Sequence, residues 1–271
     1  MKLMKRFYTN CGKCNGKVVL EKHKLPQIVE DKVVCATCFP VLPPKKAVMT
    51  EDLGKIFEMA ICMLYDIPYD GKYKYGADAA EKIKDRIAPL KTVFPYQLRH
   101  IAKNGSRYDF ATVDGEMYLS AKTNKKDGKV CPQVIGQPSK KKFCEHFGLD
   151  MSMDLDQIKQ YIEANIHSLL NTYFENTFDC PVIYYNQHKN VLLFVKAKQH
   201  IDWTTKNIGF SHHIKQKKWN ESSCICVDGV NIGEFQVHHN RDCIKYRWVF
   251  HNVLKQFADQ FEVVELKNDL P

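Results

Sequence analysis

The chain has 271 residues, of which 44% are hydrophobic and 11% aromatic, so it can bury a substantial core and global disorder is excluded. Forty lysines and arginines outweigh 31 acidic residues, for a formal net charge of +9, which favours a polyanionic partner such as nucleic acid. Charge alone does not distinguish such a protein from a soluble one that happens to be basic. The sequence has no run of about 18 apolar residues, as a membrane span requires, and no signal-peptide pattern. We therefore expect an intracellular, cytoplasmic protein with no membrane partner.

The N-terminal segment carries two CxxC pairs, Cys11 with Cys14 and Cys35 with Cys38, separated by twenty residues. One CxxC turn can present two thiolates to an ion, and two such turns complete the tetrahedral coordination that Zn²⁺ prefers. A unit of about 45 residues has too small a core to fold unaided, so a bound metal supplies stability. We predict a structural Zn²⁺ site in a zinc-ribbon-like module over residues 1–45. Such modules bind DNA, RNA or protein, so the zinc does not identify the partner.

A run of prolines and lysines near residues 40–46 predicts a linker, which places a second domain over 46–271. Thr50 is a candidate N-cap for a helix whose apolar residues recur at helical spacing until Pro68. A second helix is predicted over about 78–87.

The rest of the chain alternates between strand and helix patterns. A β-hairpin is predicted over residues 107–123, around the turn sequence Asp114-Gly115. Helices are predicted over 155–174 and 244–258, and strands over 182–186, 190–197, 223–227 and 231–238. These elements predict an α/β (α+β) domain with a central mixed sheet flanked by helices.

The hairpin brings polar residues together. With a two-residue turn at 114–115, Asp109 lies opposite Ser120, and opposed residues share a face of the sheet. Lys122 is two residues beyond Ser120 and shares that face. A carboxylate beside a lysine suits phosphodiester hydrolysis, because the carboxylate can hold a hard cation such as Mg²⁺ and the lysine can orient or deprotonate water.

These residues resemble the motif of the PD-(D/E)xK nuclease superfamily, an aspartate on one strand followed by acid-x-lysine on the next. Asp109 stands in the aspartate position and Lys122 in the lysine position. Ser120 falls where the acid usually lies, a departure that removes one metal ligand. Members also take an acid from the helix before the hairpin, for which Glu58 is the candidate. The resemblance implies a catalytic group of these four residues, with Mg²⁺ held by Asp109 and Glu58.

Further stretches are similar to type II restriction enzymes, namely 119–124 continuing to 133–137, and 233–238 followed by Arg241, Lys245 and Arg247. The resemblance covers roughly residues 50–260. It implies a restriction-modification endonuclease, a hydrolase that cuts double-stranded DNA at a specific sequence. Two scissions of a duplex are easily made by a C2 dimer, so a homodimer is expected.

Basic clusters and two glutamines are candidate DNA contacts. Gln133 and Gln137 could recognise bases, because glutamine can pair bidentately with adenine. Phosphate contacts are predicted for Lys140, Lys141, Lys217, Lys218, Arg241, Lys245 and Arg247. Each of these side chains could equally belong to an ordinary solvated surface.

Four histidines, His212, His213, His238 and His239, suggest a histidine-metal nuclease. However, His238 ends a predicted strand and no matching asparagine-histidine helix follows, so we do not predict that class.

Three alternatives to the restriction enzyme remain open. A non-enzymatic zinc-ribbon protein would bind nucleic acid in a salt-sensitive way without metal-dependent cleavage. A repair or junction-resolving nuclease of the same superfamily would cut by structure instead of sequence. A zinc-stabilised protein-interaction module would bind nucleic acid only through weak charge effects.

Overall fold

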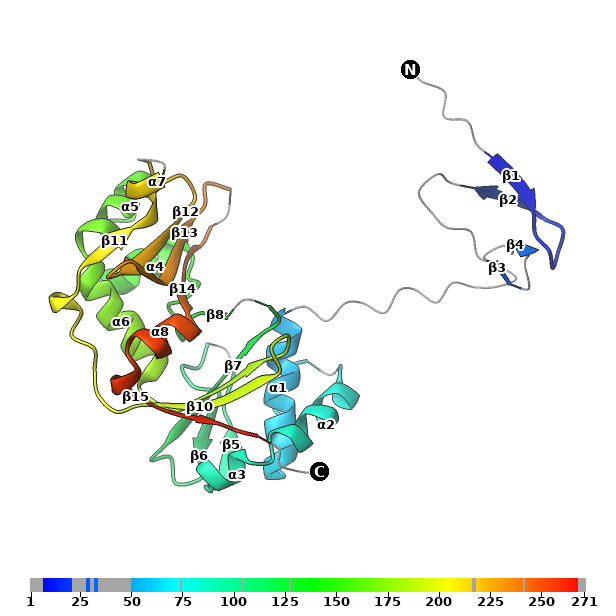
Figure 1. The fold of residues 1–271 in the computed structure, drawn as a ribbon, viewed down its shortest axis with the longest axis horizontal. Coiled ribbons are helices and arrows are strands. Elements are labelled where there is room, and N and C mark those ends of the chain that lie inside the picture. The colour runs from blue at the N-terminus through cyan, green and yellow to red at the C-terminus, as the bar shows by residue number, and fades with distance from the viewer. Residues whose placement is uncertain are drawn as a thin grey trace, which may run out of the picture. The chain divides into compact units, whose positions relative to one another are not determined.

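The computed structural model describes residues 7–20, 28–29, 32–33, 50–73, 75–103, 105–126, 128–215, 218–240 and 242–267. The chain divides into two units, Met1–Val48 and Met49–Pro271, and each is considered by itself (Figure 1).

The described part of the first unit consists of short antiparallel strand pairs. Strand β1 (Phe7–Asn10) pairs with β2 (Lys17–Leu20), and β3 (Ile28–Val29) pairs with β4 (Lys32–Val33). The first predicted cysteine pair, Cys11 and Cys14, lies in the turn between β1 and β2. The second pair, Cys35 and Cys38, lies outside the described residues.

The second unit is built around a six-stranded mixed sheet with the strand order β15-β10-β9-β7-β6-β5. Strand β7 pairs with β9 in parallel, and the other neighbours in this sheet are antiparallel. This arrangement confirms the predicted central mixed sheet. The strands are β5 (Leu98–His100), β6 (Phe110–Thr112), β7 (Tyr118–Asn124), β9 (Val182–Asn186), β10 (Val191–Ala197) and β15 (Phe261–Glu265).

One face of this sheet is covered by the helices that precede it in the chain (Figure 1). They are α1 (Thr50–Tyr65), α2 (Ala77–Arg86) and α3 (Leu90–Val93). Phe57 of α1 stacks on Tyr185 of β9, with ring centroids 5.6 Å apart. Leu119 and Ile183 belong to the same buried cluster. Both helices predicted before residue 90 are therefore confirmed; α1 packs on the sheet, and α2 packs on α1.

A second sheet, antiparallel throughout and not predicted as separate, has the strand order β11-β12-β13-β14-β8. Its strands are β8 (Lys129–Val130), β11 (Ile208–Phe210), β12 (Ser222–Val227), β13 (Val230–Val237) and β14 (Ile244–Val249). Strand periodicity shows where strands lie but not which sheet they join, because pairing connects segments far apart in sequence. The two sheets follow each other directly, since the chain passes from β7 into β8.

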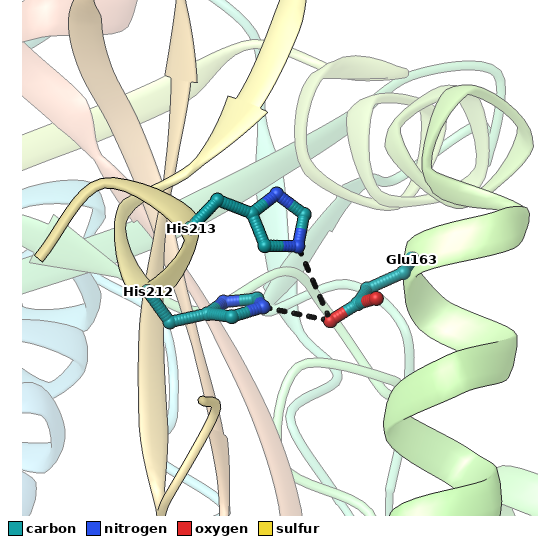
Figure 2. Close-up of side chains that lie close together, drawn as sticks. All are labelled: Glu163, His212 and His213. Carbon is teal, nitrogen blue, oxygen red and sulfur yellow. Dashed lines mark ion pairs between the residues drawn. The ribbon is translucent and has the colours of Figure 1, made fainter. Parts of the chain in front are cut away.

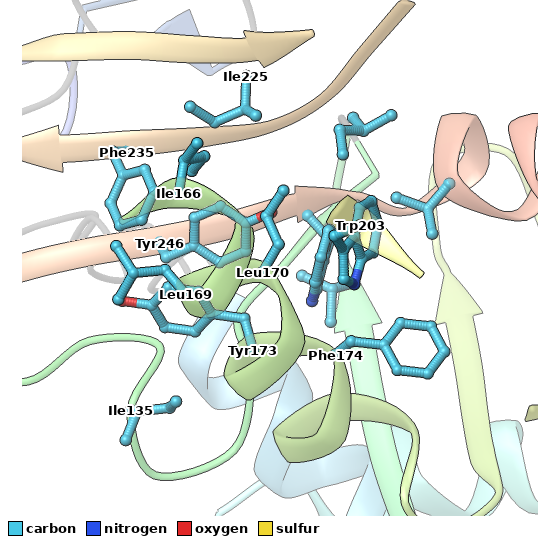
Figure 3. Close-up of a cluster of buried hydrophobic side chains, with 14 of the residues drawn as sticks. Ile135, Ile166, Leu169, Leu170, Tyr173, Phe174, Trp203, Ile225, Phe235 and Tyr246 are labelled. Atoms are coloured by element: carbon cyan, nitrogen blue, oxygen red, sulfur yellow. The ribbon is translucent and has the colours of Figure 1, made fainter. Parts of the chain in front are cut away.

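Between the two sheets lies the larger core, shown in Figure 3. Tyr173 of helix α6 stacks on Tyr246 of β14, with ring centroids 4.3 Å apart. Nε1 of Trp248 donates a hydrogen bond to Oγ1 of Thr177 at 2.9 Å, so the buried indole has a partner. The helices on this side are α4 (Lys140–Phe147), α5 (Leu155–Ala164), α6 (Ile166–Phe178), α7 (Ser211–Lys215) and α8 (Phe250–Gln256).

Two helix predictions need correction. The helix expected over 244–258 is strand β14 followed by the short helix α8. Buried and less buried residues alternate along β14, and its buried aromatic residues pack into the core between the sheets. The helix expected over 155–174 is interrupted at Asn165, whose φ of −117° departs from helical geometry, and continues to Phe178. Among the described residues, no helix is long and apolar enough to cross a membrane.

The larger core predicts that two substitutions of an aliphatic residue by alanine change the free energy of unfolding by very different amounts. Leu170 is fully buried in the centre of the larger core, whereas the side chain of Ile214 is 78% exposed. Leu170→Ala should lower the free energy of unfolding by about 2–5 kcal/mol, because it removes buried methyl groups and leaves a cavity. Ile214→Ala should change it by less than about 0.5 kcal/mol. Urea unfolding followed by tryptophan fluorescence measures both, since all three tryptophans lie in this core. Equal losses would contradict the packing.

Candidate active site

The hairpin of β6 and β7 keeps the predicted register. Phe110 lies opposite Leu119, so the next pair outward is Asp109 with Ser120. Phe110 and Leu119 are buried against α1 and α2, which holds the register because a slip by one residue would expose both. The expected juxtaposition of Asp109 and Ser120 is therefore confirmed.

The hairpin turn is wider than expected. The prediction was a two-residue turn at Asp114-Gly115, which in its common form needs positive φ at both positions. Of these two residues only Gly115 has positive φ, at 79°. The backbone N–H of Thr112 donates to the carbonyl of Met117 at 2.9 Å, which leaves a loop of residues 113–116. Both loops have the same centre, so this error does not change the strand register.

The Asp109 carboxylate is held in place from two sides. Its Oδ2 accepts hydrogen bonds from the backbone N–H of Ala121 at 2.7 Å and from Nε2 of Gln133 at 3.2 Å. The same Nε2 donates to Oγ of Ser120 at 2.7 Å. Gln133 therefore bridges Asp109 and Ser120. Gln133 is predicted to recognise bases, and in the structure its amide nitrogen contacts Asp109 and Ser120.

The surroundings of Asp109 disfavour the charged form of its carboxyl group. Burial raises the pKa of Asp109 above its ordinary value, because a carboxylate loses hydration there. The positive charge of Lys122 opposes this effect, and the negative charge of Glu58 adds to it. Three of the four predicted catalytic residues therefore interact electrostatically. A bound cation would stabilise the charged form of this half-buried carboxylate, which has a second acid nearby.

Glu58 projects from α1 and is buried. Nζ of Lys55 contacts both of its carboxylate oxygens, at 2.7 and 2.9 Å. Nε2 of His100 lies 3.3 Å from Oε2. The backbone N–H of Asp70 donates to Nδ1 of the same histidine at 3.3 Å, so Nε2 carries the ring proton and donates it to Glu58. None of these contacts was predicted from the sequence. The i,i+3 spacing on α1 was the available signal for Lys55, whereas His100 and Asp70 reach this place only through tertiary packing.

Asp109 and Lys122 line two different cavities. Asp109 borders a cavity of about 700 Å³ together with Lys55 and Asp70. Lys122 borders another of about 790 Å³. The cationic side chains of the second cavity are Lys122, Lys125, Lys126, Lys129, Lys245 and Arg247, and no acidic residue of the described part of the chain lines it. The first cavity has mixed charge, because Lys55, Lys72 and Lys103 line it beside Asp70 and Asp109, whereas the second presents a concentrated positive field that can attract a polyanion.

The second sheet supplies part of the cavity that Lys122 lines, which we call the basic cavity. Lys245 and Arg247 lie two residues apart on β14, opposite Gln236 and Glu234 of β13. Burial alone would raise the pKa of Glu234, but hydrogen bonds from Lys129 and Arg247 bring it below its ordinary value. Glu234 therefore fixes two of the cationic side chains in place. Glu234 lies in the stretch 233–238 that resembles restriction enzymes, and the sequence yields no separate prediction for it.

Of the nine predicted DNA contacts, three line the basic cavity, namely Gln137, Lys245 and Arg247. Lys140, Lys141 and Lys218 do not line it. Nζ of Lys141 lies 3.8 Å from a carboxylate oxygen of Glu145 on the same helix. Lys217 and Arg241 lie outside the described residues. Sequence analysis missed Lys125, Lys126 and Lys129, although their spacing after Lys122 was the available signal.

Comparison with known proteins identifies one relevant relative. The chain is 48% identical over 219 residues to the type II restriction enzyme CviAII of Paramecium bursaria Chlorella virus 1. The match covers 80% of this chain and 64% of that protein, so just under two thirds of the relative is represented. No protein-family model and no solved structure matches the chain.

The half-buried Asp109 carboxylate predicts that its substitution by asparagine stabilises the fold. The folded-state pKa of Asp109 lies above that of an unfolded aspartate, so at neutral pH the folded state holds an unfavourable charge. Asp109→Asn should therefore raise the free energy of unfolding at pH 8. The gain should shrink as the pH falls through the raised pKa, because the wild-type carboxyl then becomes neutral. Urea unfolding at several pH values measures this.

Asp228→Asn is the matched control, because Asp228 is exposed in the turn between β12 and β13. It should leave stability nearly unchanged across the same pH range. A loss of stability in Asp109→Asn at pH 8 would contradict the assigned environment of Asp109.

Proposed function

We propose that the protein is a Mg²⁺-dependent endonuclease that cleaves double-stranded DNA at a specific sequence, as a type II restriction enzyme does. The observation that carries this proposal is the position of Lys122, which interacts with Asp109 and also lines the basic cavity. One lysine thus belongs both to a candidate catalytic pair and to a candidate DNA-binding surface. The identity to CviAII supports the same activity, as does the resemblance of the hairpin to PD-(D/E)xK nucleases, whose fold we propose for this unit.

Asp109 and Glu58 fit a hard divalent cation. Both offer carboxylate oxygens, the ligand type that Mg²⁺ prefers, and the charge of Glu58 raises the pKa of Asp109. Bound Mg²⁺ supplies neutralisation of phosphate charge and activation of water. Binding at Glu58 competes with Lys55, whose Nζ contacts both carboxylate oxygens.

Lys122 and Gln133 have distinct roles in this proposal. The ammonium group of Lys122 stabilises negative charge on the attacked phosphate or orients the water that attacks it. Gln133 positions the site, because it holds the Asp109 carboxylate and the Ser120 hydroxyl in a fixed relation. Ser120 replaces the usual acid and serves as a polar neighbour.

The basic cavity is the proposed binding surface for the DNA backbone. Lysine and arginine side chains bind phosphates by displacing condensed counterions. The part of the cavity on β14 is held rigidly through Glu234, so the cationic groups keep their places without DNA. A homodimer is the proposed assembly, because two such sites would cut both strands of a duplex.

A zinc module at the N-terminus is a further part of the proposal. Cys11 and Cys14 lie on one tight turn, where the N–H of Lys13 contacts Sγ of Cys11 at 3.4 Å. The N–H of Gly12 donates to the carbonyl of Val33 at 2.8 Å, and Val33 precedes Cys35 by two residues in the sequence. The first cysteine pair and the segment leading to the second are therefore neighbours, as a four-cysteine Zn²⁺ site requires.

Cleavage of unmethylated plasmid and phage DNA with Mg²⁺ tests the activity. The wild type should give discrete fragments. Asp109→Asn and Lys122→Ala should each slow cleavage by at least about a hundredfold, because the first removes a ligand of the catalytic cation and the second removes a positive charge beside the attacked phosphate. Lys82→Ala should cut at the wild-type rate, since this exposed lysine of α2 does not line the basic cavity.

The same assay separates the alternatives. Cleavage restricted to branched or damaged DNA would favour a repair or junction-resolving nuclease. Salt-sensitive binding by a folded wild type that cuts no DNA, with Mn²⁺ also tried, would favour a non-enzymatic zinc-ribbon protein. Full activity in both site variants would remove the hairpin from the catalytic site.

The basic cavity predicts a measurable salt dependence. In the Asp109→Asn background, the affinity for duplex DNA should fall linearly on a logarithmic plot against salt concentration. Each phosphate contact contributes about 0.9 to that slope, so replacing Lys125 and Lys126 together by alanine should reduce its magnitude by about 2. Lys82→Ala should leave the slope unchanged. Equal slopes in all three proteins would exclude this cavity as the DNA surface.

A further inference from the structure

A second group of metal-ligating side chains lies apart from the hairpin. It consists of Glu163 on α5 with His212 and His213 on α7 (Figure 2). One ligand atom from each lies within 4.8 Å of the other two. In the part of the chain that the structure describes, no other three histidine, cysteine or acidic side chains meet in this way.

His212 is held in a fixed orientation. It is buried and stacks on Trp219, with ring centroids 5.4 Å apart. Its Nδ1 lies 2.7 Å from Oγ of Ser223. The Ser223 hydroxyl can donate to the carbonyl of Cys224 at 3.5 Å, so its oxygen can accept a hydrogen bond from Nδ1. In that tautomer Nε2 presents its lone pair to Glu163, the arrangement found for histidines that bind metals.

The two histidines converge on one oxygen. Nε2 of His212 lies 2.8 Å from Oε1 of Glu163, and Nε2 of His213 lies 3.9 Å from the same atom. A hydrogen bond from His212 would account for the first distance but not for the direction of His213, whose side chain is largely exposed. Ligands about 2.0–2.2 Å from a tetrahedral Zn²⁺ are themselves about 3.4 Å apart. The two observed distances lie on either side of that value.

We propose that Glu163, His212 and His213 form a Zn²⁺ site with two nitrogen ligands, one oxygen ligand and one position open to water. Imidazole and carboxylate are both suitable ligands for zinc. The exposed side of His213 gives the ion an entry path.

A bound ion would also stabilise the local structure around α7. Helix α7 has only five residues, which is too short to be stable by its own hydrogen bonds. Glu163 belongs to α5, a separate helix of the larger core. An ion bound by both helices would therefore fasten α7 and the neighbouring strand β12 to the helical layer. The other two histidines noted in the sequence, His238 and His239, are not part of this group, and Nδ1 of His238 lies 3.1 Å from a carboxylate oxygen of Glu221.

Zinc binding by the full-length protein tests the proposal. Equilibrium dialysis against Zn²⁺, followed by elemental analysis, should show one fewer ion per chain in Glu163→Gln and in His213→Ala than in the wild type. His188→Ala is the matched control, because His188 is exposed in the turn between β9 and β10, and it should bind as the wild type does.

Cobalt substitution separates this site from the proposed cysteine site. Thiolate ligands give Co²⁺ an intense charge-transfer absorption, and a site of two histidines and a glutamate gives none. The Glu163 and His213 variants should lose one Co²⁺ while keeping that absorption. Co²⁺ should also quench Trp219, which stacks on His212, in the wild type but not in the variants. Equal metal content and equal quenching in all four proteins would overturn the proposal.

Discussion

The parallel pairing of β7 with β9 is the constraint on which the rest of the structure depends. It sets Ser120 opposite Val182 and Lys122 opposite Tyr184, and it joins the hairpin to the second half of the sheet. Strand β7 packs against α1 on one face, and on its other face Ser120 is buried while Lys122 lines the basic cavity. A polar group in such a strand needs a partner, and Ser120 finds one in Gln133. The end of β7 then leads into β8 and the second sheet.

This topology brings opposite charges close without cancelling them. Asp109 and Glu58 are two acids in a partly dehydrated place, and Lys122 and Lys55 lie beside them. Each acid is kept in position by neutral or cationic donors, so both carboxylates are in place before any ligand arrives. The arrangement disfavours the folded state at neutral pH, as is common where function requires a buried charge.

The second sheet contributes positively charged side chains to the basic cavity. Alternation along β14 sends Tyr246 and Trp248 into the core, and Lys245 and Arg247 to the cavity. Glu234 on the neighbouring strand holds Arg247 and Lys129, so part of the positive charge is structural. The remaining cations follow Lys122 along the chain, which makes the cavity continuous with the candidate catalytic strand.

Local patterns were enough to predict the hairpin register, helices α1 and α2, and strands β9, β10, β12 and β13 within one or two residues. These depend on turn residues and on side-chain periodicity, which act over a few neighbouring positions. The candidate pair of Asp109 and Lys122 followed from the same counting. The wrong helix at 244–249 arose because aromatic residues at helical spacing can also alternate along a strand.

The tertiary structure alone decided which residues surround that pair. Gln133 reaches Asp109 across 24 positions and His100 reaches Glu58 across 42, and neither contact has a local signal. The separation into two sheets, the meeting of Lys245 and Arg247 with the end of β7, and the convergence of Glu163 with His212 have the same origin. Sequence periodicity determines which face of an element is buried, whereas the partner on that face is set by packing between segments far apart in the chain.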